Sequence, residues 1–297
     1  VAGWTCWKRW KARSSGSTDI QNVADLNEAM EGIELVFHCA ALVSFDPRKK
    51  KQLMLVNVEG TANVVNSALA AGVKKLIHVS SIAALGRNKK GKPIDEQTVW
   101  EKSKWNSDYG LSKYLAEREV WRAMGEGMQV AMVNPSMILG AGRWSEGTGN
   151  FFSMIWQGFP FYPAGSTGFV DAGDVAAFMV QLIEEDQAFG KKYILSSENL
   201  SYFSFFSAIA AGLGKQAPRI KVNAAFRLLA GLWSYPARWF SSSELMLTPQ
   251  TLRQSSVNSV YDNTMSETLT GFSYTPVSKT IEWLCAGFLA QAKTVSE

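Results

Sequence analysis

Residues 33–40 read Ile-Glu-Leu-Val-Phe-His-Cys-Ala, and residues 75–80 read Lys-Leu-Ile-His-Val-Ser. Both runs are short and mostly apolar, which is typical of strands that are buried on both faces of a sheet. Between them, residues 53–71 show the apolar spacing of a helix, and Gly72 follows as its C-terminal stop. A buried strand, a helix and a second buried strand in succession predict a parallel α/β sheet.

The same alternation continues along the chain and then weakens. Towards residue 150 we predict helices over 25–30 and 107–124 and a strand over 129–134. Beyond residue 151 we predict a strand leading into a helix over 169–185, a strand over 192–196, and helices over 202–212, 224–233 and 277–292. We therefore expect a sheet domain over residues 1–160 and a smaller mixed α/β portion over 161–297. A strand from one of these parts can join the sheet of the other.

Composition excludes several classes of protein. The chain has 297 residues, of which 46% are hydrophobic, so it is globular rather than disordered. Its net charge is +4, and the four basic residues within positions 1–13 contribute all of it. The rest of the chain is neutral overall, so the charge does not indicate a nucleic-acid-binding surface. No run of 18 uncharged apolar residues is present, so no membrane span is predicted.

The cysteines and histidines indicate neither a disulfide framework nor a metal site. Three widely spaced cysteines, an odd number, favour a reducing compartment, and we expect a cytoplasmic protein. His38 and His78 are the only histidines, and each lies inside an apolar run. We interpret both as buried strand residues rather than metal ligands.

Tyr109 and Lys113 are the strongest candidates for chemistry. Four residues apart on the predicted helix over 107–124, they lie on one helix face. A nearby ammonium favours the phenolate, and lowering the pKa of a phenol by about 3 units corresponds to about 4 kcal/mol. A hydroxyl from Ser80 or Ser81, where the preceding strand ends, could hold a substrate oxygen beside the phenol. The alternative is a commonplace tyrosine–lysine pair on a solvated helix face.

An ordered series of short motifs sets this pair in context. The motifs are His38-Cys-Ala-Ala41, Asn57-Val-Glu-Gly-Thr61, Val79-Ser-Ser-Ile-Ala-Ala-Leu-Gly86, Tyr109 with Lys113, Asn134-Pro-Ser-Met-Ile-Leu-Gly140, Phe169-Val-Asp-Ala-Gly-Asp-Val175, Leu247-Thr-Pro249 and Tyr261-Asp-Asn263. Over about residues 19 to 290 the series resembles the extended short-chain dehydrogenase/reductase family, within the epimerase/dehydratase superfamily. In particular it is similar to the branch that holds dihydroflavonol-4-reductase-like and 3β-hydroxysteroid-dehydrogenase-like enzymes.

The resemblance implies a Rossmann-type sheet, a nicotinamide cofactor and a set of roles. It assigns Ser81, Tyr109, Lys113 and Asn57 to catalysis, Asn57 by supporting the active-site helix and a bound water. It assigns cofactor contacts to Ala40, Ala41, Ser80, Tyr109, Lys113, Pro135 and Ser136. The implied reaction is hydride transfer between the cofactor, NAD or NADP, and a carbon bearing oxygen on a small molecule. The family also forms homodimers through the helices that here carry Asn57 and Tyr109.

The opening of the chain departs from the family pattern. The family begins with a strand and a Gly-x-x-Gly-x-x-Gly turn that holds the cofactor pyrophosphate, and nothing before Asp19 matches it. We expect a truncated or frame-shifted product in which residues 1–15 are not native to the family. Without the opening strand, residues 33–40 would present a sheet edge. We then expect low stability and little affinity for NAD(P).

Three functions stay open. The first is a reductase or dehydrogenase acting on a hydroxyl/carbonyl pair of a small, partly apolar substrate. The second is a nucleotide-sugar epimerase or dehydratase. The third is a catalytically silent fragment that keeps the site residues but holds no cofactor. Two basic runs, over residues 48–51 and 87–92, could attract an anionic substrate or could simply be solvated loops.

Overall fold

The computed structural model describes residues 19–87, 91–103, 106–222 and 249–294. Its main sheet contains four parallel strands in the order β1-β2-β3-β7. These are β1 (Leu35–His38), β2 (Lys75–Val79), β3 (Gln129–Pro135) and β7 (Lys191–Leu195). The parallel α/β sheet that the sequence predicts is therefore confirmed. β7 comes from beyond residue 160 and pairs with β3.

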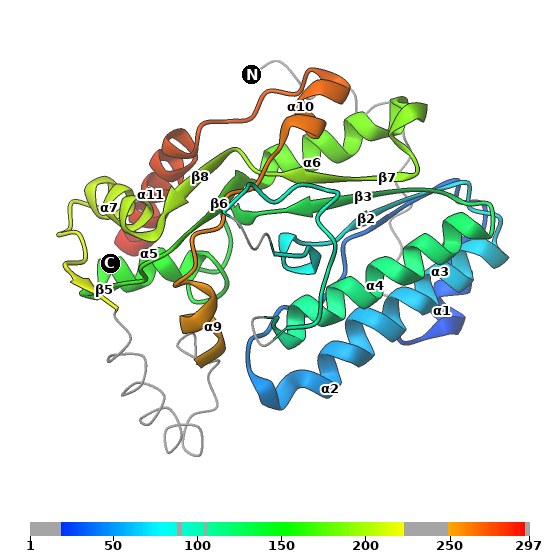
Figure 1. Ribbon diagram of the computed structural model, residues 1–297, viewed down its shortest axis with the longest axis horizontal. Coiled ribbons are helices and arrows are strands. Elements are labelled where there is room, and N and C mark those ends of the chain that lie inside the picture. The colour runs from blue at the N-terminus through cyan, green and yellow to red at the C-terminus, as the bar shows by residue number, and fades with distance from the viewer. Residues whose placement is uncertain (1–18, 88–90, 104–105, 223–248, 295–297) are drawn as a thin grey trace.

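Helices cover both faces of this sheet, as Figure 1 shows. One face carries α1 (Val23–Met30), α3 (Gly60–Ala70) and α4 (Asp108–Gly125), and the other carries α6 (Ala172–Gln181) and α10 (Thr264–Thr270). A 3-10 turn, η2 (Pro47–Lys49), α2 (Lys50–Leu53) and a π-helical turn, η3 (Met54–Glu59), lead without a break into α3. The helix predicted over residues 53–71 is thus present and begins at residue 50.

Strand β3 shows how one sheet supplies two cores. Val130 and Met132 pack with α1, α3 and α4, whereas Ala131 and Val133 pack with α6. Successive side chains of a strand point to opposite faces, so a strand between two helical layers is apolar at every position. Burial of β3 on both faces is the reason that its sequence reads as a continuous apolar run.

The remainder of the chain builds a smaller body beside the carboxyl ends of the main strands (Figure 1). Its three-stranded sheet has the order β4-β6-β8, and β5 pairs with β9. Its strands and helices are β4 (Met137–Leu139), α5 (Gly149–Trp156), β5 (Phe161–Tyr162), β6 (Ser166–Asp171), β8 (Glu198–Ser201), α7 (Tyr202–Gly212), β9 (Ile220–Lys221), α9 (Pro249–Gln254) and α11 (Val277–Thr294). Phe152, Phe169 and Phe205 are fully buried in its core.

Some predicted elements of the smaller body agree closely with the observed ones, and others were missed. The helix over 202–212 has the predicted bounds, and the strand over 192–196 is shifted by one residue. The short strands β4, β5, β8 and β9 were not predicted, because two to four residues show no measurable period. The helix predicted over 224–233 lies outside the described residues.

β1 is the end strand of the main sheet within the described part of the chain. It pairs with β2 on one side, and Phe37 in its middle is 40% exposed. This agrees with the expectation that residues 33–40 present a sheet edge, although the strand itself spans only four residues. No helix of the described residues is long and apolar enough to cross a membrane.

Candidate functional site

Three strands of the main sheet deliver the predicted site residues to one edge. Because β1, β2 and β3 are parallel, Ala40, Ser81 and Ser136 all follow the carboxyl end of a strand. Ligands of open parallel sheets bind at this edge. The segment after β2 turns at once into a 3-10 turn, η4 (Ile82–Ala84), which the Ser81 hydroxyl caps by accepting a hydrogen bond from Ala83 N at 3.1 Å.

Helix α4 begins beside this turn and brings Tyr109 to Ser81. The Ser107 hydroxyl accepts a 2.8 Å hydrogen bond from Gly110 N and so caps the helix. A Cβ atom at Gly110 would lie 2.6 Å from Ala83 O, so only glycine lets α4 approach η4 this closely. The helix start is therefore fixed by Ser107, and its distance from the strand end is fixed by Gly110.

Tyr109 is a buried phenol, 9% exposed, with an aromatic neighbour. The ring of Phe45 meets it edge-on, with centroids 5.7 Å apart. Burial raises the pKa of Tyr109, and a hydrogen bond with the Ser81 side chain opposes that rise. The expectation that Lys113 lowers the pKa of Tyr109 is wrong for this structure, because desolvation outweighs every favourable contact of the phenolate.

Lys113 is 1% exposed and lies against strand β2. Its Nζ donates to Val79 O at 2.8 Å and lies 3.4 Å from His78 Nε2. Desolvation lowers the pKa of Lys113 to about 8, against the opposing effects of Glu117 and Cys39. The interpretation of His38 and His78 as buried strand residues is confirmed, since they are 3% and 0% exposed. Burial holds the pKa of His38 at about 4 and that of His78 well below its usual range, so both rings are neutral.

Asn57 lies in the π-helical turn η3 and is 1% exposed. Its Nδ2 donates to Leu42 O and to Ser112 Oγ, each at 2.9 Å, and its Oδ1 accepts from Leu42 N at 2.7 Å. The amide thus joins the loop after β1 to helix α4 next to Lys113. The π turn, which often marks functional sites, aims this side chain across to α4.

The cofactor-side residues fall into three settings. Ala40 and Ala41 are exposed and line an open hollow of about 390 Å³ together with Asp19, Ile20, Leu42 and Val56. Pro135 ends β3, and Ser136 follows it with a buried hydroxyl that has no hydrogen-bond partner within the described residues. Ser80 differs from both, because its hydroxyl donates to Glu117 Oε1 at 2.5 Å inside the protein.

Glu117 is the site residue that the sequence reasoning missed. It is 3% exposed and lies one helical turn after Lys113. The available signal was its spacing, since Tyr109, Lys113 and Glu117 recur at intervals of four on α4 and share a face. A glutamate on a helix is so often solvated that this spacing alone did not distinguish it.

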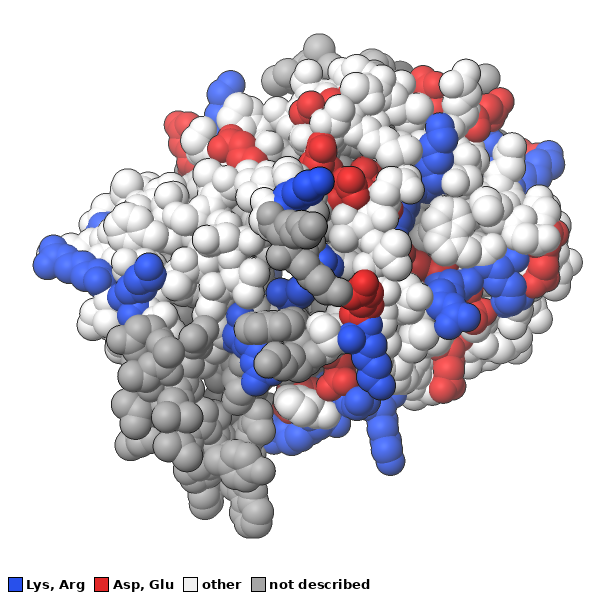
Figure 2. Space-filling model, viewed as in Figure 1, with Lys and Arg blue, Asp and Glu red and all other residues white. Residues whose placement is uncertain are grey.

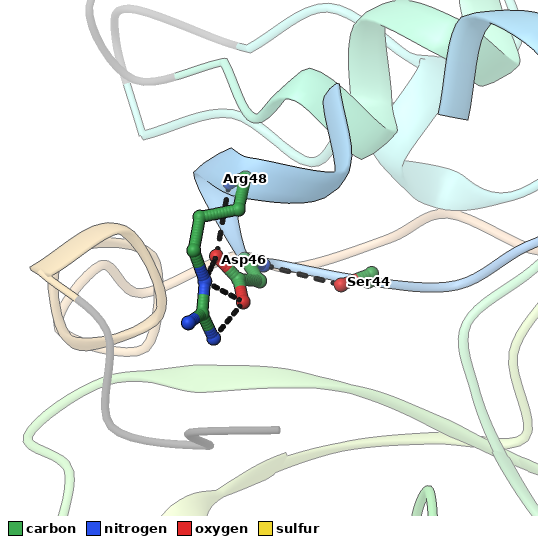
Figure 3. A network of polar contacts seen from close by, with 3 residues as sticks. All are labelled: Ser44, Asp46 and Arg48. Carbon is green, nitrogen blue, oxygen red and sulfur yellow. Dashed lines mark hydrogen bonds and ion pairs between the residues drawn. The ribbon is translucent and has the colours of Figure 1, made fainter. Parts of the chain in front are cut away.

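Two of the four residues in the basic run at 48–51 pair with nearby carboxylates. Figure 3 shows Arg48 folded back on Asp46, whose Oδ2 lies 2.8 Å from Arg48 Nε, while Asp46 N donates to Ser44 Oγ at 3.2 Å. Lys50 pairs with Asp108 at 3.0 Å. Figure 2 shows lysine and arginine side chains gathered around this segment, with acidic side chains among them. These pairs favour a solvated surface over an anion-binding site, and the run lies in η2 and α2 rather than in a loop.

Comparison with known families gives a clear match. Residues 7–146 match the model of the 3-beta hydroxysteroid dehydrogenase/isomerase family. The chain is 30% identical over 205 residues, 67% of its length, to a putative dihydroflavonol 4-reductase of Synechocystis, of which it covers 59%. It spans between 59% and 65% of the length of this and two further curated relatives. The family match begins at residue 7, within the stretch 1–15 that the sequence analysis expects to be foreign to the family.

Solved structures give the same fold. The structure of gox2253 superposes with a TM-score of 0.76 at 29% identity, over 92% of this chain and 84% of the other. The UDP-glucose 4-epimerase of Thermotoga maritima, solved with UDP-glucose, superposes with a TM-score of 0.74 at 16% identity, over 93% and 84%. The second likeness concerns the fold alone, whereas the first also extends to the sequence.

Proposed function

The chain belongs to the extended short-chain dehydrogenase/reductase family, and on that premise we propose that it is an NAD(P)-dependent oxidoreductase. The proposed reaction interconverts a hydroxyl and a carbonyl group on a small, partly apolar substrate. The observation that carries the proposal is the close approach of α4 to the turn that begins at Ser81, which places Tyr109 beside Ser81 at the carboxyl edge of the sheet and one helical turn from Lys113.

In carbonyl reduction, Tyr109 gives its hydroxyl proton to the substrate oxygen as that oxygen gains negative charge. The raised pKa of Tyr109 keeps the phenol protonated and ready to act as an acid. The Ser81 hydroxyl donates to the same oxygen and sets its distance from the phenol. Bound NAD or NADP supplies the hydride to the carbon in this direction and accepts it in the reverse one.

Lys113 has two roles in this proposal. Its ammonium group has three donors, of which one bonds Val79 O and a second faces His78. The remaining donor is available for a ribose hydroxyl of the cofactor. Its positive charge stabilises the phenolate that Tyr109 becomes after proton transfer. This attraction grows stronger when the ligand displaces water and lowers the local dielectric constant.

The described residues fit the nicotinamide and ribose portion of the cofactor. The small side chains of Ala40 and Ala41 leave the hollow at the end of β1 open, and the unpartnered hydroxyl of Ser136 can serve a polar group of the ligand. We therefore propose NAD(P) as the ligand of this edge.

Two measurements test the function. Isothermal titration with NAD, NADP and their reduced forms measures binding, and absorbance at the nicotinamide band measures turnover with a panel of apolar aldehydes and ketones. Tyr109→Phe should abolish turnover while keeping the edge contact with Phe45. Tyr114→Phe is the control and should keep turnover, because Tyr114 lies on the same helix but stacks on Trp100, with ring centroids 4.4 Å apart.

Retained turnover in Tyr109→Phe would refute the assigned role. UDP- and GDP-sugars in the same assay test the epimerase or dehydratase alternative, which predicts a changed sugar without net change of nicotinamide absorbance. Cofactor binding below detection at millimolar concentration, in protein that unfolds cooperatively, would favour the catalytically silent alternative.

Two further expectations accompany this function. We propose a homodimer formed through the helices that carry Asn57 and Tyr109, to be measured by light scattering. We also propose a reducing, cytoplasmic setting, which the free thiols of Cys39 and Cys285 support.

A further inference from the structure

Glu117 is a carboxyl group in the interior of the protein, 3% exposed, on the face of α4 that carries Tyr109 and Lys113. Desolvation raises its pKa, opposed chiefly by Lys192 and by hydrogen bonds from Ser80 and Asn134. Burying a carboxylate is costly unless it is paired and hydrogen-bonded. A helix that needed only packing at this position would have an apolar residue.

One oxygen of Glu117 accepts from two strand ends. Oε1 accepts from Ser80 Oγ at 2.5 Å and from Asn134 Nδ2 at 2.6 Å. Ser80 follows β2, and Asn134 lies near the end of β3. The same Asn134 amide donates to Ser81 O at 2.9 Å, so the chain of contacts reaches the residue that meets Tyr109.

The other oxygen faces a cation from a third strand. Lys192 Nζ, on β7, lies 3.8 Å from Glu117 Oε2. Three strands of the main sheet thus converge on one carboxyl group of α4. Lys113, one turn away on the same helix, completes the charged groups around it, and Glu117 raises the pKa of Lys113 against desolvation.

We propose that Glu117 is a positioning residue that holds the strand end carrying Ser81 in register with the helix carrying Tyr109 and Lys113, and that its carboxylate forms one charged cluster with Lys192 and Lys113. Its catalytic consequence rests on the proposed oxidoreductase function, but its structural and electrostatic consequences do not. The Ser80 hydroxyl then serves this contact rather than a cofactor.

Two substitutions separate the hydrogen bonds of Glu117 from its charge. Glu117→Gln keeps an oxygen that can accept from Ser80 and Asn134 but removes the charge. Glu117→Ala removes both and leaves two buried donors without an acceptor, which destabilises a protein by about 1–3 kcal/mol for each unsatisfied group. Glu119→Gln is the matched control, because Glu119 lies on the same helix, pairs with Arg122 and is partly exposed.

The first readout needs neither cofactor nor substrate. Protein labelled with ¹³C-lysine is titrated by NMR, and the Lys113 Cε resonance is assigned by its loss in Lys113→Arg. Loss of the Glu117 charge should lower the pKa of Lys113 by about 0.5 pH unit or more in both Glu117 variants. Glu119→Gln should leave it unchanged. An unchanged Lys113 titration in Glu117→Gln overturns the electrostatic part of the proposal.

The second readout is kinetic. Displacement of Ser81 by a fraction of an ångström to an ångström should lower kcat of Glu117→Ala by up to about 10²-fold, with KM little changed. Glu117→Gln should recover most of that loss at a pH well below the pKa of Lys113. Equal kcat in Glu117→Ala and the unaltered protein overturns the positioning role.

If no turnover is found in any variant, the oxidoreductase function fails. The Lys113 titration and the unfolding midpoints of Glu117→Gln and Glu117→Ala still decide the proposal about Glu117.

Discussion

Asn57 Nδ2 donates a 2.9 Å hydrogen bond to Ser112 Oγ, and this contact joins the helical segment after β1 to the helix that carries Tyr109 and Lys113. Ser112 Oγ in turn donates to Tyr109 O at 2.8 Å. The position of Tyr109 thus depends on a buried amide that reaches its backbone through one hydroxyl. Stability and site geometry are coupled at this point.

Replacing Asn57 by alanine should therefore be costly. The change removes three hydrogen bonds and leaves the N–H and C=O of Leu42 without this partner. We expect the free energy of unfolding to fall by about 2–4 kcal/mol, measured by urea denaturation. Asn66→Ala is the control, because Asn66 is exposed and its side-chain oxygen accepts a single hydrogen bond within the described residues, from Arg122 Nη2. A loss of less than about 0.5 kcal/mol for Asn57→Ala would contradict the bridging role.

Gly110→Ala should destabilise the protein although alanine is the better helix former. Alanine in a helix interior is favoured over glycine by about 1 kcal/mol, yet a Cβ at Gly110 would lie 2.6 Å from Ala83 O. We expect a net loss of about 1–3 kcal/mol and weaker activity, because α4 must move away from η4. Gly125→Ala, in the last turn of the same helix with open space around it, should be neutral or stabilising. Similar melting temperatures for the two variants would refute the close approach.

Lys113 should make stability depend on pH in a defined window. Burial lowers its pKa to about 8 in the folded protein, whereas a lysine in an unfolded chain has a pKa of about 10.4. Between these values the unfolded chain binds more protons, so the contribution of Lys113 to stability rises as pH rises from about 8 to about 10.4. Below pH 8 the buried ammonium lowers the free energy of unfolding by on the order of 3 kcal/mol. This cost disappears as the pH rises from about 8 to about 10.4.

The measurement is the difference in unfolding free energy between the unaltered protein and Lys113→Met at several pH values. This difference should move in favour of the unaltered protein by on the order of 3 kcal/mol between pH 7.5 and pH 10.5. Titrations of groups that do not interact with Lys113 occur in both proteins and cancel, and Cys39→Ala in both proteins removes the coupled thiol. Parallel pH curves for the two proteins would show that the ammonium is not desolvated as the structure indicates.

Asp174 should hold the segment between α10 and α11 against the first turn of α6. Its Oδ2 accepts from Thr275 N at 2.7 Å, and its Oδ1 accepts from Thr275 Oγ1 at 2.9 Å. Asp174→Ala should lower stability by about 1–3 kcal/mol and speed proteolysis near residue 275. Asp186→Ala removes an exposed pair with Lys75 and should change stability by less than about 1 kcal/mol. Equal rates of cleavage near residue 275 in both variants would contradict this role.

The main sheet could be predicted because its strands are buried on both faces, which leaves a continuous apolar run in the sequence. β2 and β3 are examples, since the three central residues of β2 and every residue of β3 after Gln129 are buried. The smaller body was harder to predict, because strands such as β5 and β9 are two residues long and are defined by pairing across some 60 positions. Pairing at that distance is a property of tertiary structure and leaves no local period.

The candidate site divides in the same way. Tyr109, Lys113 and Asn57 were accessible from spacing and from motif order, because four-residue spacing on a helix sets a common face. Glu117 was not, although it has the same spacing, because only burial distinguishes an interior carboxylate from a solvated one. The pKa of Tyr109 was predicted in the wrong direction for the same reason, since desolvation depends on the atoms packed around the phenol.

The sequence by itself determined the parallel α/β sheet, the family and the order in which the site residues occur, because apolar periods and motif spacing are local properties of the chain. Tertiary structure alone decided that Ser80 turns inward to Glu117, that Arg48 and Lys50 are paired with carboxylates, and that Lys113 is desolvated. Each of these depends on which distant side chain occupies the neighbouring space. Burial and charge pairing are set by the packing of elements far apart in the chain, and no local pattern encodes them.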